Sequence, residues 1–67
     1  KDEAEAAKWD RKAAELGDSD SQYHLGLMYE KGRGVAQDHA EAVKWLREAV
    51  ARGHADAKKK LEELDRH

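Results

Sequence analysis

The eleven residues from Leu25 to Val35, LGLMYEKGRGV, decide how this chain folds. In their first part, leucine, glycine and tyrosine stand at positions 25, 26 and 29, which is the spacing of neighbours on one face of a helix. In their second part, Gly32 and Gly34 lie so close together that they predict a loop with positive φ angles. The stretch therefore predicts a helix that ends in a tight loop.

On both sides of this stretch the chain repeats itself at an offset of 36 residues, the separation of Trp9 and Trp45. Of the 31 overlapping pairs, 11 are identical, and they are mainly small, aromatic and turn residues. Such residues hold the geometry of a repeated structural unit. In the first copy they are Asp2, Ala4, Glu5, Ala6, Lys8, Trp9, Arg11, Ala13, Gly17, Asp20 and Leu25.

The second copy contains the start and stop signals of a helix. Asp38 is suited to cap the first turn, and Glu41 three residues later completes a capping-box pair. Apolar residues then follow at helical spacing as far as Val50. Gly53 supplies a left-handed stop, and Arg52 lies near the negative end of the helix dipole.

The same signals upstream, with a second type of helix between them, predict four helices and no strand. The predicted fold class is all-α, with residues 1–67 forming a single repeat domain. Its helices are expected at 2–16, 19–31, 38–51 and 55–66, and the loop with Gly32 and Gly34 at 32–37.

The stretch LGLMYEKGRGV, followed by Asp38, Ala42, Trp45, Ala49 and Gly53, resembles the Sel-1-like repeat. This family is related to the tetratricopeptide repeat, and its period matches the offset found here. The resemblance covers almost the whole chain. It implies a short right-handed α-solenoid of about four antiparallel helices, or two repeats, that binds other proteins.

Three positions depart from the family pattern. Ala36 stands where the family often has proline, so the loop is expected to be less rigid. Asp10 stands where the second copy has Leu46, and the stretch 58–64 lacks the glycine and tyrosine of the family helix. The more polar outer helices are expected to cap a short, complete array.

The resemblance implies a binding site on the concave face, which the LGxxY-type helices line. Mapping the tetratricopeptide pattern onto this chain, and then applying the repeat offset, gives eight candidate binding residues. They are Asp20, Tyr23, Leu27, Glu30, Asp56, Lys59, Glu63 and Arg66.

Tyr23 beside Leu27 is the expected anchor of this face, because aromatic side chains carry a large share of interface energy. In the alternative interpretation, both residues pack against the next helix and the charged residues form a solvated rim. The face carries both signs of charge, so the sequence does not identify a ligand.

The composition excludes several other classes of protein. The chain has 13 basic and 15 acidic residues, with a net charge of −2 and no dominant basic stripe, so no nucleic-acid partner is expected. It has no apolar run of membrane-spanning length and no signal-peptide pattern, which predicts a soluble chain and leaves its compartment open. The absence of cysteine excludes disulfides and thiolate zinc sites.

Neither a metal site nor a catalytic site is expected. The four histidines, His24, His39, His54 and His67, form no HxxxH pair. Only Asp20 and His24 share a helix face, and two ligands do not make a metal site. No set of polar residues converges as catalysis requires, so the sequence predicts no cofactor and no enzyme.

Two functions therefore remain from the sequence. The first is an adaptor scaffold that binds a peptide or a partner's helix on its concave face. The second is a designed or consensus-like repeat scaffold whose activity is self-assembly. In that case Leu46 and Val50 would form the surface that meets a second copy.

Overall fold

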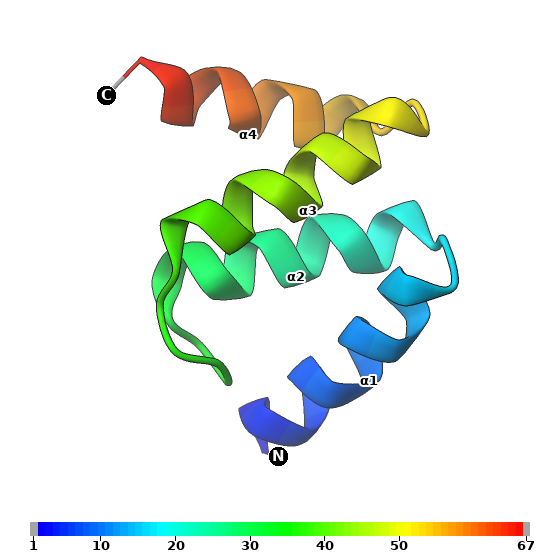
Figure 1. The fold of residues 1–67 in the computed structure, drawn as a ribbon, viewed down its shortest axis with the longest axis vertical. Helices are drawn as coiled ribbons and strands as arrows, with labels where there is room; N and C mark the ends of the chain where they lie inside the picture. The colour runs from blue at the N-terminus through cyan, green and yellow to red at the C-terminus, as the bar shows by residue number, and fades with distance from the viewer. Residues whose placement is uncertain (1, 67) are drawn as a thin grey trace.

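A computed structural model describes residues 2–66, so His67 lies outside the described residues. Within residues 2–66 the chain forms four α-helices and no strand (Figure 1). They are α1 (Glu3–Glu15), α2 (Ser19–Lys31), α3 (His39–Ala51) and α4 (Ala55–Asp65). The predicted all-α fold is confirmed, and each expected helix end lies within one residue of the observed one.

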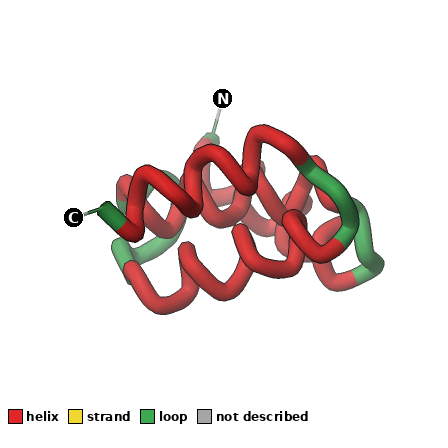
Figure 2. The backbone as a smooth tube through the Cα atoms, turned by 90° about the horizontal axis from the view of Figure 1, so that it is seen from above, coloured by secondary structure: helices red, strands yellow, loops and turns green. Residues whose placement is uncertain are grey.

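The helices stack in chain order, so that each packs on its neighbour in sequence and the two termini lie at opposite ends of the stack (Figure 1). Figure 2 shows from above that short loops and turns join them. The most extensive packing is between α2 and α3, with α1 against α2 and α4 against α3. This arrangement is a short α-solenoid of about two repeats.

Aspartate caps the first three helices, as the sequence predicts for α3. The carboxylates of Asp2, Asp18 and Asp38 each accept a hydrogen bond from a backbone N–H in the first turn of the following helix. The reciprocal half of the predicted capping box is absent, because the Asp38 N–H donates to the carbonyl oxygen of Tyr29, 3.0 Å away. A tertiary contact to the end of α2 therefore replaces the expected local bond to Glu41.

The loop after α2 folds back onto the start of α1. Gly32 ends α2 in the left-handed region with φ of 70°. A Cβ atom on Gly34, whose φ is 77°, would lie 2.3 Å from the carbonyl oxygen of Glu3. The guanidinium of Arg33 also lies 2.9 Å from the Glu3 carboxylate, in an exposed ion pair. Only glycine at position 34 permits this approach.

The core consists of two clusters, one shared by α1, α2 and α3 and the other centred on α3 and α4. The first contains both aromatic residues of the repeat pattern, Tyr29 and Trp45, which are 7% and 8% exposed. Its other buried members are Ala14, Leu25 and Ala42. The second is formed by Leu46, Ala49 and Ala57, with Tyr23, Val50, Leu61 and Leu64 partly buried against it.

The prediction that Leu46 and Val50 form a surface for self-association is wrong. Leu46 is 0% exposed, and Val50 is half-buried against the same cluster. The helix α4 packs on α3 and contributes Ala57 to this cluster. It therefore covers the apolar stripe of α3 that was expected to be exposed.

Gly26 sets the distance between α2 and α3. A Cβ atom at this position would lie 2.8 Å from Cγ of Leu46 and 3.2 Å from the carbonyl oxygen of Ala42. The absence of a side chain therefore lets Leu46 pack directly on the backbone of α2. Close-packed interiors have little room to absorb an added methyl group at such a contact.

We expect Gly26→Ala to lower the free energy of unfolding by about 1–2 kcal/mol, because overpacking outweighs the better helix propensity of alanine. Urea denaturation followed by circular dichroism measures this change. In a Leu46→Ala background, which empties the space, the same substitution should be neutral or stabilising. If Gly26→Ala raised the stability of the otherwise wild-type protein, this account of the contact would be wrong.

Candidate protein-binding surface

Four of the eight predicted binding residues line one shallow hollow between α2 and α4. Tyr23 comes from α2, whereas Asp56, Lys59 and Glu63 come from α4. The hollow has a volume of about 100 Å³ and is also lined by Lys60. Lys60 was not among the residues expected from the sequence, although it stands four residues after Asp56 and three before Glu63, on the same side of the helix.

Tyr23 serves both as a packing residue and as a lining residue. Its ring stacks on His54, with centroids 4.7 Å apart and planes 25° apart, and it packs against the cluster around Leu46. Tyr23 therefore does pack against neighbouring residues, as the alternative interpretation of the sequence expects. Tyr23 also lines the hollow, so the two interpretations are compatible.

His54 fixes the start of α4 and connects it to α2. Its Nδ1 accepts a hydrogen bond from the Ala57 N–H at 3.1 Å, which makes His54 the N-cap of α4. Its Nε2 lies 2.9 Å from the Asp20 carboxylate. Because Nδ1 is an acceptor, the hydrogen-bond network assigns the ring proton to Nε2, which donates to Asp20. This contact, and not the i,i+4 neighbour His24, occupies the Asp20 carboxylate.

Glu30 forms a second polar link between the two helices. Its carboxylate lies 3.2 Å from Nζ of Lys60, and the two side chains are only 21% and 23% exposed. The Lys60 ammonium is also 3.8 Å from Glu63. Asp20 and Glu30 thus bind residues of α4. Arg66 is exposed at the C-cap of α4 and is not among the residues that line the hollow.

Leu27 lies in a different hollow, on the α1 side of α2. This hollow has a volume of about 310 Å³ and combines the apolar side chains of Leu27 and Met28 with charges of both signs. Its remaining lining residues are Glu3, Asp10, His24, Lys31 and Arg33. In the sequence, only Asp10 hints at this hollow, because it stands where the second copy of the repeat has Leu46.

A third hollow, of about 280 Å³, lies between α1 and α3, away from the predicted binding residues. Gln22 and Trp45 lie at its buried base, and its rim carries both signs of charge. The lining residues are Ala14, Glu15, Gly17, Gln22, Lys44, Trp45, Glu48 and Arg52. No pattern in the sequence indicates this hollow, because its residues come from three helices.

In residues 2–66, histidine and carboxylate side chains nowhere gather in a group of three or more that could hold a metal ion. None of the helices in the described part of the chain has the length and apolarity needed to cross a membrane. Two carboxylates of α2, those of Asp20 and Glu30, instead contact His54 and Lys60.

The stacked helices, the glycine contact at position 26 and the hollows beside α2 define a helical-repeat protein of the α-solenoid class. The chain belongs to the Sel1 repeat family, because the Sel1 repeat model matches residues 1–18 and 19–54. This match places α2 and α3 in one unit and α1 in another. The repeat offset alone had grouped α1 with α2 and α3 with α4, since a periodic pattern has no unique starting residue.

Two known proteins show the likeness in detail. The crystal structure of a Sel1 repeat protein from Oxalobacter formigenes matches 94% of this chain, with a TM-score of 0.91 and 44% identity. DAP3-binding cell death enhancer 1 of Rattus norvegicus is 51% identical over 37 residues, or 55% of this chain. The chain spans 26% of the first protein and 7% of the second. Sel1 repeats are generally modules for protein–protein interaction, and their proteins are generally non-enzymatic scaffolds.

We expect His54→Ala to lower the free energy of unfolding by about 1–2 kcal/mol, because it removes a helix cap together with the Tyr23 stack. His54→Asn should recover part of this loss, since its side-chain oxygen can accept the Ala57 hydrogen bond. Denaturation in urea measures both variants. His39→Ala is the matched control, because His39 is exposed in the first turn of α3. If the wild type and these three variants were equally stable, His54 would not have this role.

Proposed function

We propose that this chain is a protein-interaction module that holds a peptide or a partner's helix along α2, on the concave face that α1 and α4 flank. One observation carries the proposal. The helix α2 has a hollow on each side, with Leu27 in one and Tyr23 in the other. A ligand that lies along α2 can place side chains in both hollows and so gain two points of attachment.

The chemistry of the hollows defines the kind of ligand. The larger one offers Leu27 and Met28 as an apolar floor and has room for one large side chain. The smaller one is lined mainly by ionisable side chains, two lysines and two carboxylates from α4. An amphipathic segment, with an apolar anchor on one side and polar groups on the other, satisfies both hollows.

The fixed ion pairs of the face favour binding without rearrangement. Lys60 is already held by Glu30, and Asp20 by His54, so these side chains lose little further freedom when a ligand arrives. Lys59 and Asp56 are exposed and line the hollow, and they are therefore the charges that contact the ligand.

The name of the rat relative, DAP3-binding cell death enhancer 1, suggests a first protein to test. The similarity covers only 37 residues, so DAP3 is one probe and a library of random peptides is the other. We further propose that the module acts as an adaptor scaffold without catalysis of its own, and without a nucleic-acid or membrane partner.

Leu27→Glu and Lys59→Glu should each weaken the binding of DAP3, or of a selected peptide, by at least about tenfold, which corresponds to 1.4 kcal/mol. Calorimetric titration measures the affinities, and circular dichroism checks that the variants fold. Arg47→Glu is the control, because Arg47 is exposed on α3 and lines none of the three hollows. If only the control variant lost binding, the ligand would occupy another face.

A further inference from the structure

Two buried hydrogen-bonding groups in the hollow between α1 and α3 have no partner within residues 2–66. They are Oε1 of Gln22, a residue that is 2% exposed, and the indole Nε1–H of Trp45, which is 8% exposed. Both residues line the hollow, whose volume is about 280 Å³. Buried polar groups are almost always hydrogen-bonded, because an unpaired one has lost its hydration without compensation. A ligand that pairs with both groups therefore gains two buried hydrogen bonds.

The helix α1 fixes the orientation of the Gln22 amide. Its Nε2 donates to the carbonyl oxygen of Ala14, 3.0 Å away, in the last turn of α1. Because a carbonyl oxygen only accepts, the amide nitrogen must face α1, and the amide oxygen is left without a donor. The indole of Trp45 supplies a donor and no acceptor. The base of the hollow therefore presents one acceptor and one donor.

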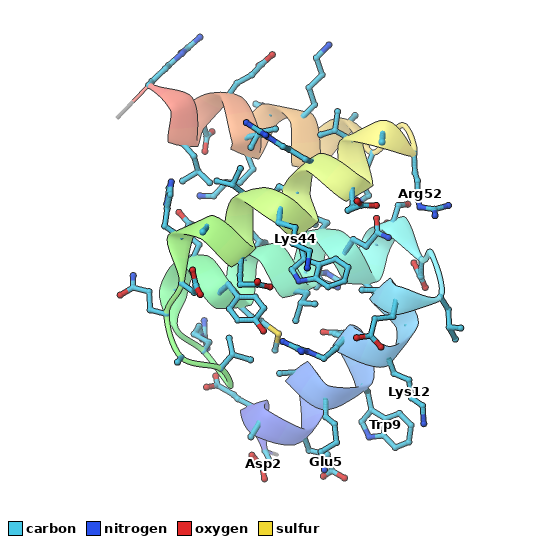
Figure 3. All side chains as sticks on the ribbon, viewed as in Figure 1. Asp2, Glu5, Trp9, Lys12, Lys44 and Arg52 are labelled. Carbon is cyan, nitrogen blue, oxygen red and sulfur yellow. The ribbon has the colours of Figure 1, made fainter. Side chains whose placement is uncertain are left out.

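The rim of the hollow is neutral as a whole. Its charged side chains are those of Glu15, Lys44, Glu48 and Arg52, all of which are exposed. Two are anionic and two cationic, so their formal charges cancel. Figure 3 shows Lys44 rising from the middle of α3 and Arg52 extending from its C-terminal end. Such a rim favours neither an anionic nor a cationic ligand.

We propose that this hollow is a binding site for a primary carboxamide, the side-chain group of an asparagine or glutamine on a partner protein. This group is neutral and carries a carbonyl oxygen and an N–H on one edge. It can therefore accept from Trp45 and donate to Gln22 together. A trans peptide bond holds the same two groups on opposite sides. The hollow is also smaller than the roughly 300–1,000 Å³ of sites for drug-sized molecules, and its size suits one side chain.

Lys44 covers the site. Its ammonium lies over the Trp45 ring, 5.1 Å from the ring centroid. The indole N–H is buried, so a ligand reaches it only when a covering side chain moves aside. Lys44 is exposed and has a flexible stem, and a cation–π contact at an exposed position is weak. The movement of Lys44 therefore costs little.

The helices that form this hollow, α1, α2 and α3, all belong to the described chain. The repeat offset relates α1 to α3, so a further unit of an array would repeat the step between these two helices. Such a unit would lie on the side of α3 away from α1, or on the side of α1 away from α3. Neither position covers the opening between them. The site also lies away from the concave face, so its test is independent of the proposed function.

Titration with propionamide, followed by NMR of the ¹⁵N-labelled protein, tests the proposal. The indole N–H resonance of Trp45 should shift as the carboxamide oxygen accepts its hydrogen bond. A dissociation constant on the order of 10 mM is expected for so small a ligand. Trp9 is 63% exposed and points away from the other helices (Figure 3), so its indole resonance is the internal control. Propionate, propylammonium and N-methylacetamide should each bind at least about tenfold more weakly.

Variants separate the two hydrogen bonds. Gln22→Leu removes the acceptor at similar size, and it should weaken propionamide binding at least about tenfold, again read from Trp45. Trp45→Phe removes the donor and keeps a ring, with the same expected loss, read from the backbone amide of Gly17 in the wall of the hollow. Lys44→Ala uncovers the ring and should not weaken binding. Arg47→Ala, at an exposed position outside the hollow, is the control, and circular dichroism checks the fold of each variant.

Three results would overturn the proposal. The first is a Trp45 resonance that does not shift in about 200 mM propionamide, far above the expected dissociation constant. The second is a folded Gln22→Leu or Trp45→Phe protein that binds propionamide as the wild type does. The third is tighter binding of one of the other three compounds. Propionate or propylammonium would then assign the hollow to a charged group, and N-methylacetamide would assign it to a peptide backbone.

Discussion

The contact between the backbone of Gly26 and the side chain of Leu46 is the constraint from which the rest of the structure follows. It holds α2 and α3 close enough for Tyr29 and Trp45 to share one buried cluster with Ala14 of α1. On its other side, Leu46 belongs to the cluster that Ala57 of α4 completes. The outer helices thus pack on surfaces that this one contact creates, which explains how so few large apolar residues hold four helices together.

The connections between helices contribute contacts of their own. The loop after α2 places Gly34 against the backbone of Glu3 and returns the Asp38 N–H to the carbonyl of Tyr29. At the next connection, His54 caps α4 and contacts both Tyr23 and Asp20 of α2. In a chain of this size, both of these turns therefore stabilise tertiary structure as well as reversing the direction of the chain.

The helices α1 and α4 differ in chemistry from their equivalents in the repeat, α3 and α2. In α1, Trp9 of the repeat pattern is exposed, and Asp10 stands where α3 has Leu46. At α4, Glu62 and Lys58 replace Gly26 and Gln22. Substitutions at a few repeat positions therefore change the polarity of helix faces that follow the same pattern.

The sequence by itself determined the four helices and their ends, because aspartate caps, glycine stops and the 3.6-residue apolar period act within a few residues of each boundary. It also predicted the close approach at Gly26 and placed Tyr23 and Lys59 on one surface. Only the tertiary structure decided which charges remain free for a ligand. Asp20 finds its partner 34 residues away at His54, and no local pattern records that contact. Only the tertiary structure, too, showed that Leu46 is buried and Trp9 exposed, because in the described chain α3 packs between α2 and α4, whereas α1 packs mainly on α2.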